Sequence, residues 1–466
     1  AALATGHLTF AAVTAALPAS SLADPVIALT LAGFGIKAGA LPLHVWLPLA
    51  HPAAPTPASA VLSGAMIKAG LLGWLRLLPA GQVALPGWGQ LVLVLGLLAA
   101  FLAAAVGIVQ RDPKAVLAYS SISQMGWMML GLGIGLATPT AWPAVLTALQ
   151  LFALHHALAK GALFLGVGVG SARGEHARFR AFVHTGLLLP ALALAGAPWT
   201  TGAAAKSALH AATEAAPAPW PTWLHALLPL ASLATGLLMA RFLVLVWPPP
   251  RDAPLRLPAS ALAAWSVLWV IPLGVLWFAP IPAFRHAIRD TVSLAATWAS
   301  LWPVLLAAAI AWRSARSPRA RQLLARLSIP PGDLVVLVER ATTALLARLR
   351  AVQAARRRLP RSAWTARLRR TALRCGDVAA RGESIVARWT VGAVLFVILT
   401  ALLAFLLHGD LDQTPPAATD LAPVEAPAAA RPRRLPHRPA RLRARQPGLH
   451  LAHAVRHRYV CSNMFI

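Results

Sequence analysis

The chain contains five lysines, and four of them lie within strongly apolar stretches. The four settings are GFGIKAGAL around Lys37, GAMIKAGLL around Lys68, HHALAKGALF around Lys160 and TTGAAAKSAL around Lys206. Arginine supplies nearly all the remaining positive charge. An ammonium can lose its proton when it is taken out of water, whereas a guanidinium in practice cannot. Lysine kept for apolar segments therefore indicates proton transfer within a membrane.

Helices that cross a membrane must hold these lysines in place. Hydrophobic residues make up 58% of the chain and charged residues 12%, with a mean hydropathy of +0.65, whereas soluble domains carry about 25% charged residues. Apolar stretches recur at the length that spans a bilayer. We predict an all-α, polytopic membrane protein with about ten spans. These are 25–48, 56–79, 87–109, 115–137, 143–170, 183–213, 222–247, 261–281, 291–312 and 389–408.

The span at 183–213 contains Gly196, Pro198 and Gly202, and these residues predict a break within the helix. The pair Pro55 and Pro57 predicts a second break, at the start of the span 56–79. Broken helices are tolerated at membrane depth where they face a protein or water-filled interior, and there they often mark ion sites.

The net charge of +28 does not indicate nucleic-acid binding, because most arginines lie in 313–388 and 431–458, outside the apolar runs. The loops near 110–114, 171–183 and 248–258 are also basic, which places them with 313–388 on the cytoplasmic side. We predict a helix bundle over 1–312 and a basic amphipathic interfacial or lateral segment over 313–388. A last transmembrane helix at 389–408 and a disordered basic tail over 409–466 follow.

No cofactor or metal site is expected. Cys375 and Cys461 belong to no CxxC pair or Cys/His cluster. The glycine-rich runs at 131–136 and 166–170 lie within apolar helices, and no strand precedes them as a phosphate-binding loop would require. They fit close helix packing instead.

Three stretches resemble one known family: GFGIKAGALPLHVWLPLAHPAAPTPASAVLSGAMIKAG (33–70), RDPKAVLAYSSISQMGWMMLGLG (111–133) and LHHALAKGALFLGVG (154–168). The family is that of the antiporter-like, proton-translocating subunits of respiratory complex I. Its relatives include hydrogenase-4 component B, the formate hydrogenlyase membrane subunit and the large subunits of multisubunit Na+/H+ antiporters. The resemblance implies an inverted-repeat fold with broken helices.

The resemblance also implies a path of protonatable groups. Its seventh-helix lysine corresponds to Lys37 and its eighth-helix lysine to Lys68, which follows the Pro55–Pro57 break. Its eleventh-helix pair corresponds to His156 and Lys160, and its twelfth-helix lysine to Lys206. Lys37 would receive the proton, and Lys206 would exchange it with one aqueous side. The possible relay groups are His155, Ser121, Ser123, Thr200 and Thr201.

One element of the family pattern is missing. In the family, the seventh-helix lysine pairs with a glutamate on helix five, but the only acids before residue 200 are Asp24, Asp112 and Glu175, none of them in the middle of a helix. We expect that the sequence lacks the N-terminal third of a family member. The alternative is a true variant without this pair.

Three functions fit the sequence. The one favoured is a proton-conducting subunit of a redox-driven complex of the NADH–quinone oxidoreductase or membrane-hydrogenase type. Such a subunit would hold no catalytic residues of its own, and its partners would be other membrane subunits in a bacterial inner membrane. The alternatives are a subunit of a multisubunit Na+/H+ antiporter and a membrane scaffold for a soluble partner.

Overall fold

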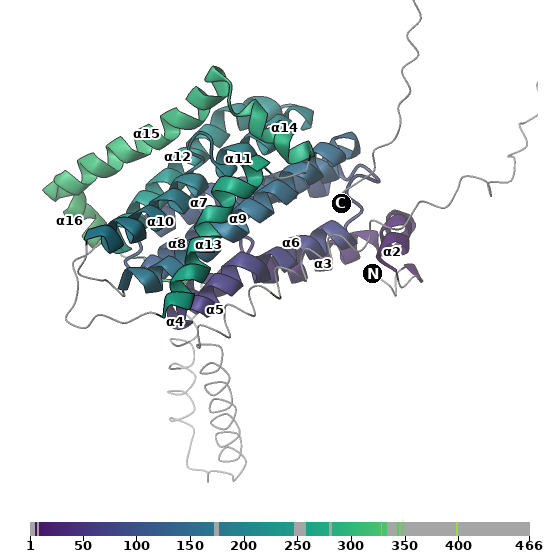
Figure 1. Ribbon diagram of the computed structural model, residues 1–466. Helices are drawn as coiled ribbons and strands as arrows, with labels where there is room; N and C mark the ends of the chain where they lie inside the picture. The colour runs from purple at the N-terminus through teal and green to yellow at the C-terminus, as the bar shows by residue number, and fades with distance from the viewer. Residues whose placement is uncertain are drawn as a thin grey trace, which may run out of the picture. The chain divides into compact units, whose positions relative to one another are not determined.

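The computed structural model describes residues 5–6, 9–171, 177–246, 258–278, 282–327 and 329–332, with single residues at 343, 347 and 398. Every regular element within these ranges is a helix (Figure 1). The predicted all-α class is therefore confirmed. The predicted helix at 389–408, the amphipathic stretch at 334–358 and the tail at 409–466 lie outside the described ranges, apart from those single residues.

The first half of the bundle contains short and interrupted helices followed by long ones. Its elements are α2 (Phe10–Ala16), η1 (Leu17–Ala19), α3 (Ala23–Ala38), α4 (Trp46–Ala53), α5 (Thr56–Val61), η2 (Leu62–Met66), α6 (Ile67–Leu77), α7 (Pro86–Ile108), α8 (Pro113–Ala137), η3 (Pro139–Ala141) and α9 (Trp142–Ser171). The second half contains α10 (Ala177–Ala195), α11 (Thr201–Ala212), η4 (Thr213–Ala215), α12 (Trp220–Val246), α13 (Ala259–Phe278), α14 (Pro282–Asp290), α15 (Leu294–Arg316) and α16 (Pro318–Arg326).

The stretch 25–48, expected as one span, consists of two helices. α3 ends at Ala38 because Gly39 adopts a left-handed conformation with φ of 66°, which caps the helix. Pro42 lies in the turn that follows, and α4 begins only at Trp46. The Trp46 indole nitrogen donates a hydrogen bond of 2.7 Å to the Ile36 carbonyl oxygen and so ties the two helices together.

The span predicted at 56–79 is a continuous helical stretch from Thr56 to Leu77, but its middle part is a π-helix, η2. Pro55 is the N-cap residue and Pro57 lies in the first turn, where a missing N–H leaves no donor unsatisfied. A π-helical turn widens the helix and disturbs its regular hydrogen bonding, and such turns are frequent at functional sites.

The long helices α7 and α8 form the centre of the bundle and cross at glycines. A Cβ added to Gly96 would lie 2.7 Å from the Gly126 carbonyl oxygen, and one added to Gly126 would lie 2.5 Å from the Gly96 oxygen. Gly89 and Gly133 make the same reciprocal approach about two helical turns further along the two helices. Small residues thus let the two backbones touch. In α8, every residue from Ala115 to Leu136 is buried, so neighbouring elements surround this helix.

α10 and α11 occupy the span predicted at 183–213 and are separated by the turn 196–200. α10 ends at Ala195, and Gly196 has a φ of 87°, a conformation that favours glycine. Thr200 then caps α11, accepting a hydrogen bond from the Ala203 backbone N–H. The two half-helices therefore point their ends at one another inside the bundle.

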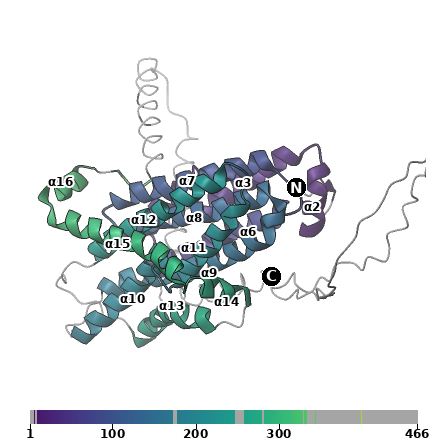
Figure 2. The same ribbon diagram turned by 90° about the horizontal axis from the view of Figure 1, so that it is seen from above.

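Five helical stretches in the described ranges are long and apolar enough to cross a membrane: Thr56–Leu77, Pro86–Ile108, Pro139–Gly170, Trp220–Val246 and Leu294–Arg316. α15 packs beside α12 (Figures 1 and 2), and it extends to Arg316, beyond the end predicted at 312. The total of about ten spans and the division into four regions stay predictions.

Candidate functional site

Four of the five residues of the expected path lie inside the bundle. Lys68, His156, Lys160 and Lys206 are buried, although each can carry a charge. They come from three elements of the fold: α6 and α11 each carry one lysine, and α9 carries the histidine and the lysine one turn apart. Burial of ionisable groups is costly, so a set of this kind indicates a functional site.

Lys68 and Lys160 are linked through hydrogen bonds to the backbone and side chains of Ser63, Ser121 and Leu117. The Lys68 ammonium donates to the Ser63 carbonyl oxygen within the π-helix η2. The Ser63 and Ser121 hydroxyl oxygens are 2.8 Å apart, and the Ser121 hydroxyl donates to the Leu117 carbonyl oxygen at 3.0 Å. The Lys160 ammonium donates to that same oxygen at 2.8 Å. The two lysines therefore share one polar network across α6, α8 and α9.

His155 and His156 lie on α9, in the turn before Lys160, and His155 contacts α11. The His155 ring nitrogen Nδ1 lies 2.6 Å from the Thr201 hydroxyl at the start of α11. His156 lies within electrostatic reach of Lys68 and Lys160, and neither of its ring nitrogens has a hydrogen-bond partner in the described part of the chain. A buried polar atom without a partner needs an explanation, and unplaced water is one such explanation.

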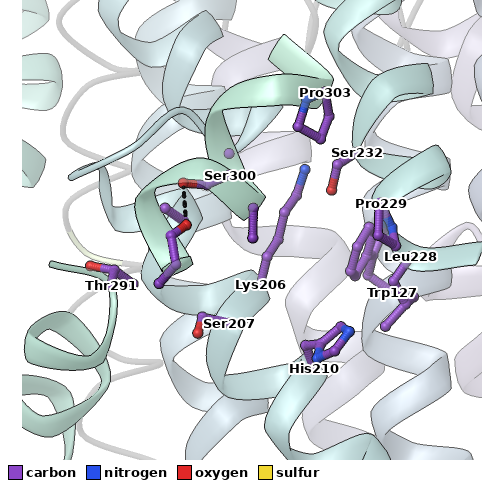
Figure 3. Close-up of a pocket in the computed structure, with 14 residues that line it drawn as sticks. Trp127, Lys206, Ser207, His210, Leu228, Pro229, Ser232, Thr291, Ser300 and Pro303 are labelled. Carbon is purple, nitrogen blue, oxygen red and sulfur yellow. Dashed lines mark hydrogen bonds between the residues drawn. The ribbon is translucent and has the colours of Figure 1, made fainter. Parts of the chain in front are cut away.

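Lys206 lies at the break between α10 and α11. Its ammonium donates a hydrogen bond of 3.0 Å to the Ala195 carbonyl oxygen, at the end of α10. It also lies 5.1 Å from the centroid of the Trp127 ring, within the range of a cation–π contact. A cavity of about 170 Å³ opens beside it, and Figure 3 shows Lys206 extending into this space between Trp127 and α15.

Backbone carbonyl oxygens, and not carboxylates, accept the described hydrogen bonds of the three buried lysines. Lys68 donates to a carbonyl oxygen of the π-helix η2. Lys206 donates to the Ala195 carbonyl oxygen, which lies at the end of α10, where carbonyls have no partner within the helix. In the described ranges, the carboxylates Asp24, Glu214 and Asp290 are exposed, and Asp112 is only partly buried. Within these ranges, no hydrogen bond or ion pair to a carboxylate is described for Lys68, Lys160 or Lys206.

Two of the expected relay hydroxyls point elsewhere. The Ser123 hydroxyl donates at 2.8 Å to the Ala100 carbonyl oxygen on α7, on the side of α8 away from the lysines. Thr200 caps α11 and donates at 2.6 Å to the Ala197 carbonyl oxygen. Both contacts hold the helices in place. Only Ser121 and Thr201 of the expected hydroxyls touch groups of the buried network.

The residues of the second break have distinct roles. Gly196 lies against Lys206, since an added Cβ would come within 3.0 Å of the lysine Cδ. Gly202 lets α11 approach α10, because an added Cβ would lie 1.7 Å from the Ala193 carbonyl oxygen. Pro198 lies in the turn between the two half-helices. The break therefore shapes the space that Lys206 occupies.

Lys37 differs from the other lysines of the expected path. It lies near the end of α3 and is exposed, and within the described ranges it has no hydrogen bond or ion pair. The neighbouring side chains Leu29 and Ile36 are exposed as well. The structure therefore does not bring Lys37 together with the buried network, and its role stays a prediction.

The sequence reasoning missed His51. This residue of α4 is fully buried, and its ring stacks on Phe164 of α9 with the centroids 4.3 Å apart. It lies within electrostatic reach of Lys160, Lys114 and Lys68, and neither ring nitrogen has a partner in the described residues. Its proline-rich surroundings, with Pro48 and Pro52, gave no periodic signal that would place it in the core.

A family model described as NADH:quinone oxidoreductase/Mrp antiporter, transmembrane, matches residues 3–217. Residues 3–217 are therefore similar to this antiporter-like family. All the buried groups described above lie within this family segment. The family resemblance expected from the motifs is thereby confirmed.

Curated relatives share this segment. Hydrogenase-4 component B of Escherichia coli (strain K12) is 40% identical over 171 residues, which are 35% of this chain and 25% of the relative. Formate hydrogenlyase subunit 3 of the same organism is 36% identical over 179 residues, 37% of this chain and 29% of the relative. The chain thus spans between a quarter and a third of the length of these two relatives.

A solved structure shows the same fold. The Mrp complex from Dietzia sp. DQ12-45-1b contains a chain that matches with a TM-score of 0.51 and 21% sequence identity. The match covers 64% of this chain and 65% of that one. The protein is therefore a membrane-integral, antiporter-like helix bundle, and the relatives are named as components or subunits of larger assemblies.

Proposed function

We propose that this chain conducts protons across a membrane as a subunit of a redox-driven complex. The observation that carries the proposal is the hydrogen-bonded set Lys68–Ser63–Ser121–Leu117–Lys160. It places the hydroxyl pair of Ser63 and Ser121 between two buried ammonium groups, each of which donates to its own backbone carbonyl oxygen. Hydroxyls can both donate and accept, so they support proton transfer between groups that cannot touch directly.

The transfer follows from the chemistry of a desolvated lysine. Burial disfavours the charged form of an amine, and the carbonyl acceptors offset that cost only in part. When one of the buried lysines takes up a proton, its positive charge repels the charge on the next lysine. In the described ranges, no buried carboxylate lies between them to weaken this repulsion. His156, which lies close to Lys68 and Lys160, can take up the proton in between.

Protons suit this network better than Na+ does. A sodium ion needs several oxygen ligands, whereas ammonium and imidazole groups dominate the buried network. The serine hydroxyls that reach it are already hydrogen-bonded to one another or to carbonyl oxygens. The relatives named as hydrogenase-4 and formate hydrogenlyase components support the redox-driven complex over the antiporter.

The wider setting belongs to the same proposal. The partners are other membrane subunits, which supply the driving force, and the membrane is the inner membrane of a bacterium. The chain itself carries out no electron transfer. Lys37 joins the path on its sequence motif alone, because it is exposed and no hydrogen bond or ion pair is described for it in the described ranges.

Proton flux into proteoliposomes that contain the full chain tests the proposal. The assay uses an imposed pH gradient and a pH-sensitive dye in sodium-free buffer. Lys160→Ala and Lys206→Ala should each reduce the flux at least about tenfold, because each removes a group that carries the proton, and a tenfold change corresponds to about 1.4 kcal/mol. Arg76→Ala, which removes a cation from the end of α6, serves as the control and should leave the flux unchanged. Wild-type flux in both lysine variants would refute the proposal.

A further inference from the structure

A cluster of titratable side chains lies beyond Lys206 and is not part of the buried network. It consists of His210 near the end of α11, Glu214 in η4 and His225 in the second turn of α12. The His225 nitrogen Nε2 contacts the Glu214 carboxylate. The rings of His210 and His225 meet edge to face, with their centroids 4.6 Å apart. The three side chains thus form a contiguous series.

The series runs from water to the interior. The side chains of His225 and Glu214 have relative exposures of 49% and 60%, so both meet solvent freely. His210 is only partly exposed and lies one helical turn after the buried Lys206. Exposure therefore falls step by step along the series toward the lysine.

His210 and Lys206 line the same cavity. Figure 3 shows Lys206 extending toward Pro303 and Ser232, while the His210 ring lies toward the other end of the space, near Trp127. Hydroxyls of Ser207, Ser232 and Ser300 also line this cavity. Its volume of about 170 Å³ is large enough for several waters. Water held there would span the gap between imidazole and ammonium.

We propose that Glu214, His225 and His210 form the proton-exchange site through which Lys206 communicates with the aqueous phase. Glu214 and His225 collect or release protons at the surface, and His210 passes them through cavity water to Lys206. No bond other than those to the proton forms or breaks, and each imidazole takes up a proton on one nitrogen as it releases one from the other. The inference rests on the proposed function of Lys206.

The site faces the side of the membrane opposite the basic loops. α9 ends and α10 begins at the arginine-rich stretch 171–183, and α10 and α11 together cross the bundle to reach Glu214. By the distribution of arginine, that end is the non-cytoplasmic one. The exchange site therefore opens on the outer face.

The charged groups of the helices packed near α11 do not bind to His210, Glu214 or His225 in the described ranges. α14 packs against α11 and carries Arg285, His286, Arg289 and Asp290, all exposed. None of them forms a hydrogen bond or ion pair with the series within the described ranges. α15 borders the cavity with Ser300 and Pro303, and its arginines, Arg313 and Arg316, lie in its last turn, several turns further along the helix.

Proton flux in proteoliposomes with the full chain, combined with buffer rescue, tests the inference. His210→Ala and the double variant Glu214→Gln/His225→Ala should slow the flux about tenfold or more, within the range of lost proton-relay groups. Imidazole added on the outer side should restore much of the flux in the double variant, because it replaces the lost carrier. His286→Ala removes an exposed histidine of α14 and should behave as wild type.

The outcomes separate the two proposals. Wild-type flux in His210→Ala and in the double variant, with flux lost in Lys206→Ala, would overturn the exchange site and leave the lysine path in place. A loss of flux that imidazole does not restore would also overturn it, because it would show that the cluster only holds the fold. Wild-type flux in both Lys206→Ala and Lys160→Ala would refute the proposed function itself.

Discussion

The Lys206 ammonium nitrogen lies 5.1 Å from the centroid of the Trp127 ring. The contact joins α11 to the buried helix α8, and the only hydrogen bond described for the ammonium goes to the Ala195 carbonyl oxygen. An aromatic face stabilises a cation without fixing it as firmly as a carboxylate would. We therefore predict that the Trp127 ring favours the charged form of Lys206 while still permitting release of the proton.

Replacing the Trp127 ring tests this contact. Trp127→Leu should reduce proton flux by about tenfold to thirtyfold, because a desolvated cation–π contact contributes on the order of 2 kcal/mol. Trp127→Phe keeps an aromatic face and should retain most of the flux. Equal flux in the Leu and Phe variants, measured in proteoliposomes at matched protein content, would show that the ring has no electrostatic role.

The two buried serines of α8 provide a matched pair. Ser121 contacts Ser63 and the acceptor of Lys160, whereas Ser123 donates to Ala100 on α7. Ser121→Ala should slow proton flux several-fold, and Ser123→Ala should not. Each should lower the thermal stability by a similar amount, on the order of 1 kcal/mol for one hydrogen bond. If both variants slowed the flux equally, the loss would reflect stability and not the network.

His51 can be tested without disturbing its packing. Phenylalanine at this position keeps a ring that can stack on Phe164, so His51→Phe should retain the melting temperature to within a few degrees. It removes both ring nitrogens, so proton flux should fall if His51 carries protons near Lys160. Flux at the wild-type level would assign His51 to packing alone.

The break between α10 and α11 depends on Gly202. Gly202→Ala places a Cβ 1.7 Å from the Ala193 carbonyl oxygen, and overpacking of this kind costs about 1–3 kcal/mol or more. The variant should melt earlier and lose proton flux because Lys206 shifts. Gly87→Ala at the start of α7, where an added Cβ meets nothing within 4 Å, is the control. Equal melting temperatures for the two variants would contradict the close approach.

Local chemistry made the helices and their breaks predictable. Long apolar stretches gave the spans of α7, α9 and α12, and Gly196 with Pro198 indicated where one helix is interrupted. The single span at 25–48 was wrong, because the cap formed by Gly39 ends α3 within an apolar run that shows no change in composition.

The contacts between helices that build the site could not be predicted from the sequence. Ser63 and Ser121 lie 58 residues apart, and hydrophobic periodicity cannot pair them because their helices are apolar on several faces. The same reason hid the stacking of His51 on Phe164 and the meeting of His210 with His225. Local sequence also could not separate Lys37 from Lys68. Both lysines lie in similar stretches, but Lys37 is exposed and Lys68 is buried.

The Lys160→Arg variant tests most directly the claim that buried lysines carry protons by releasing them. Arginine keeps the positive charge and can still donate to the Leu117 carbonyl oxygen, but it does not release its proton. In proteoliposomes with an imposed pH gradient, we expect proton flux to fall to the level of Lys160→Ala while the protein remains folded. Flux at the wild-type level in Lys160→Arg would contradict the claim.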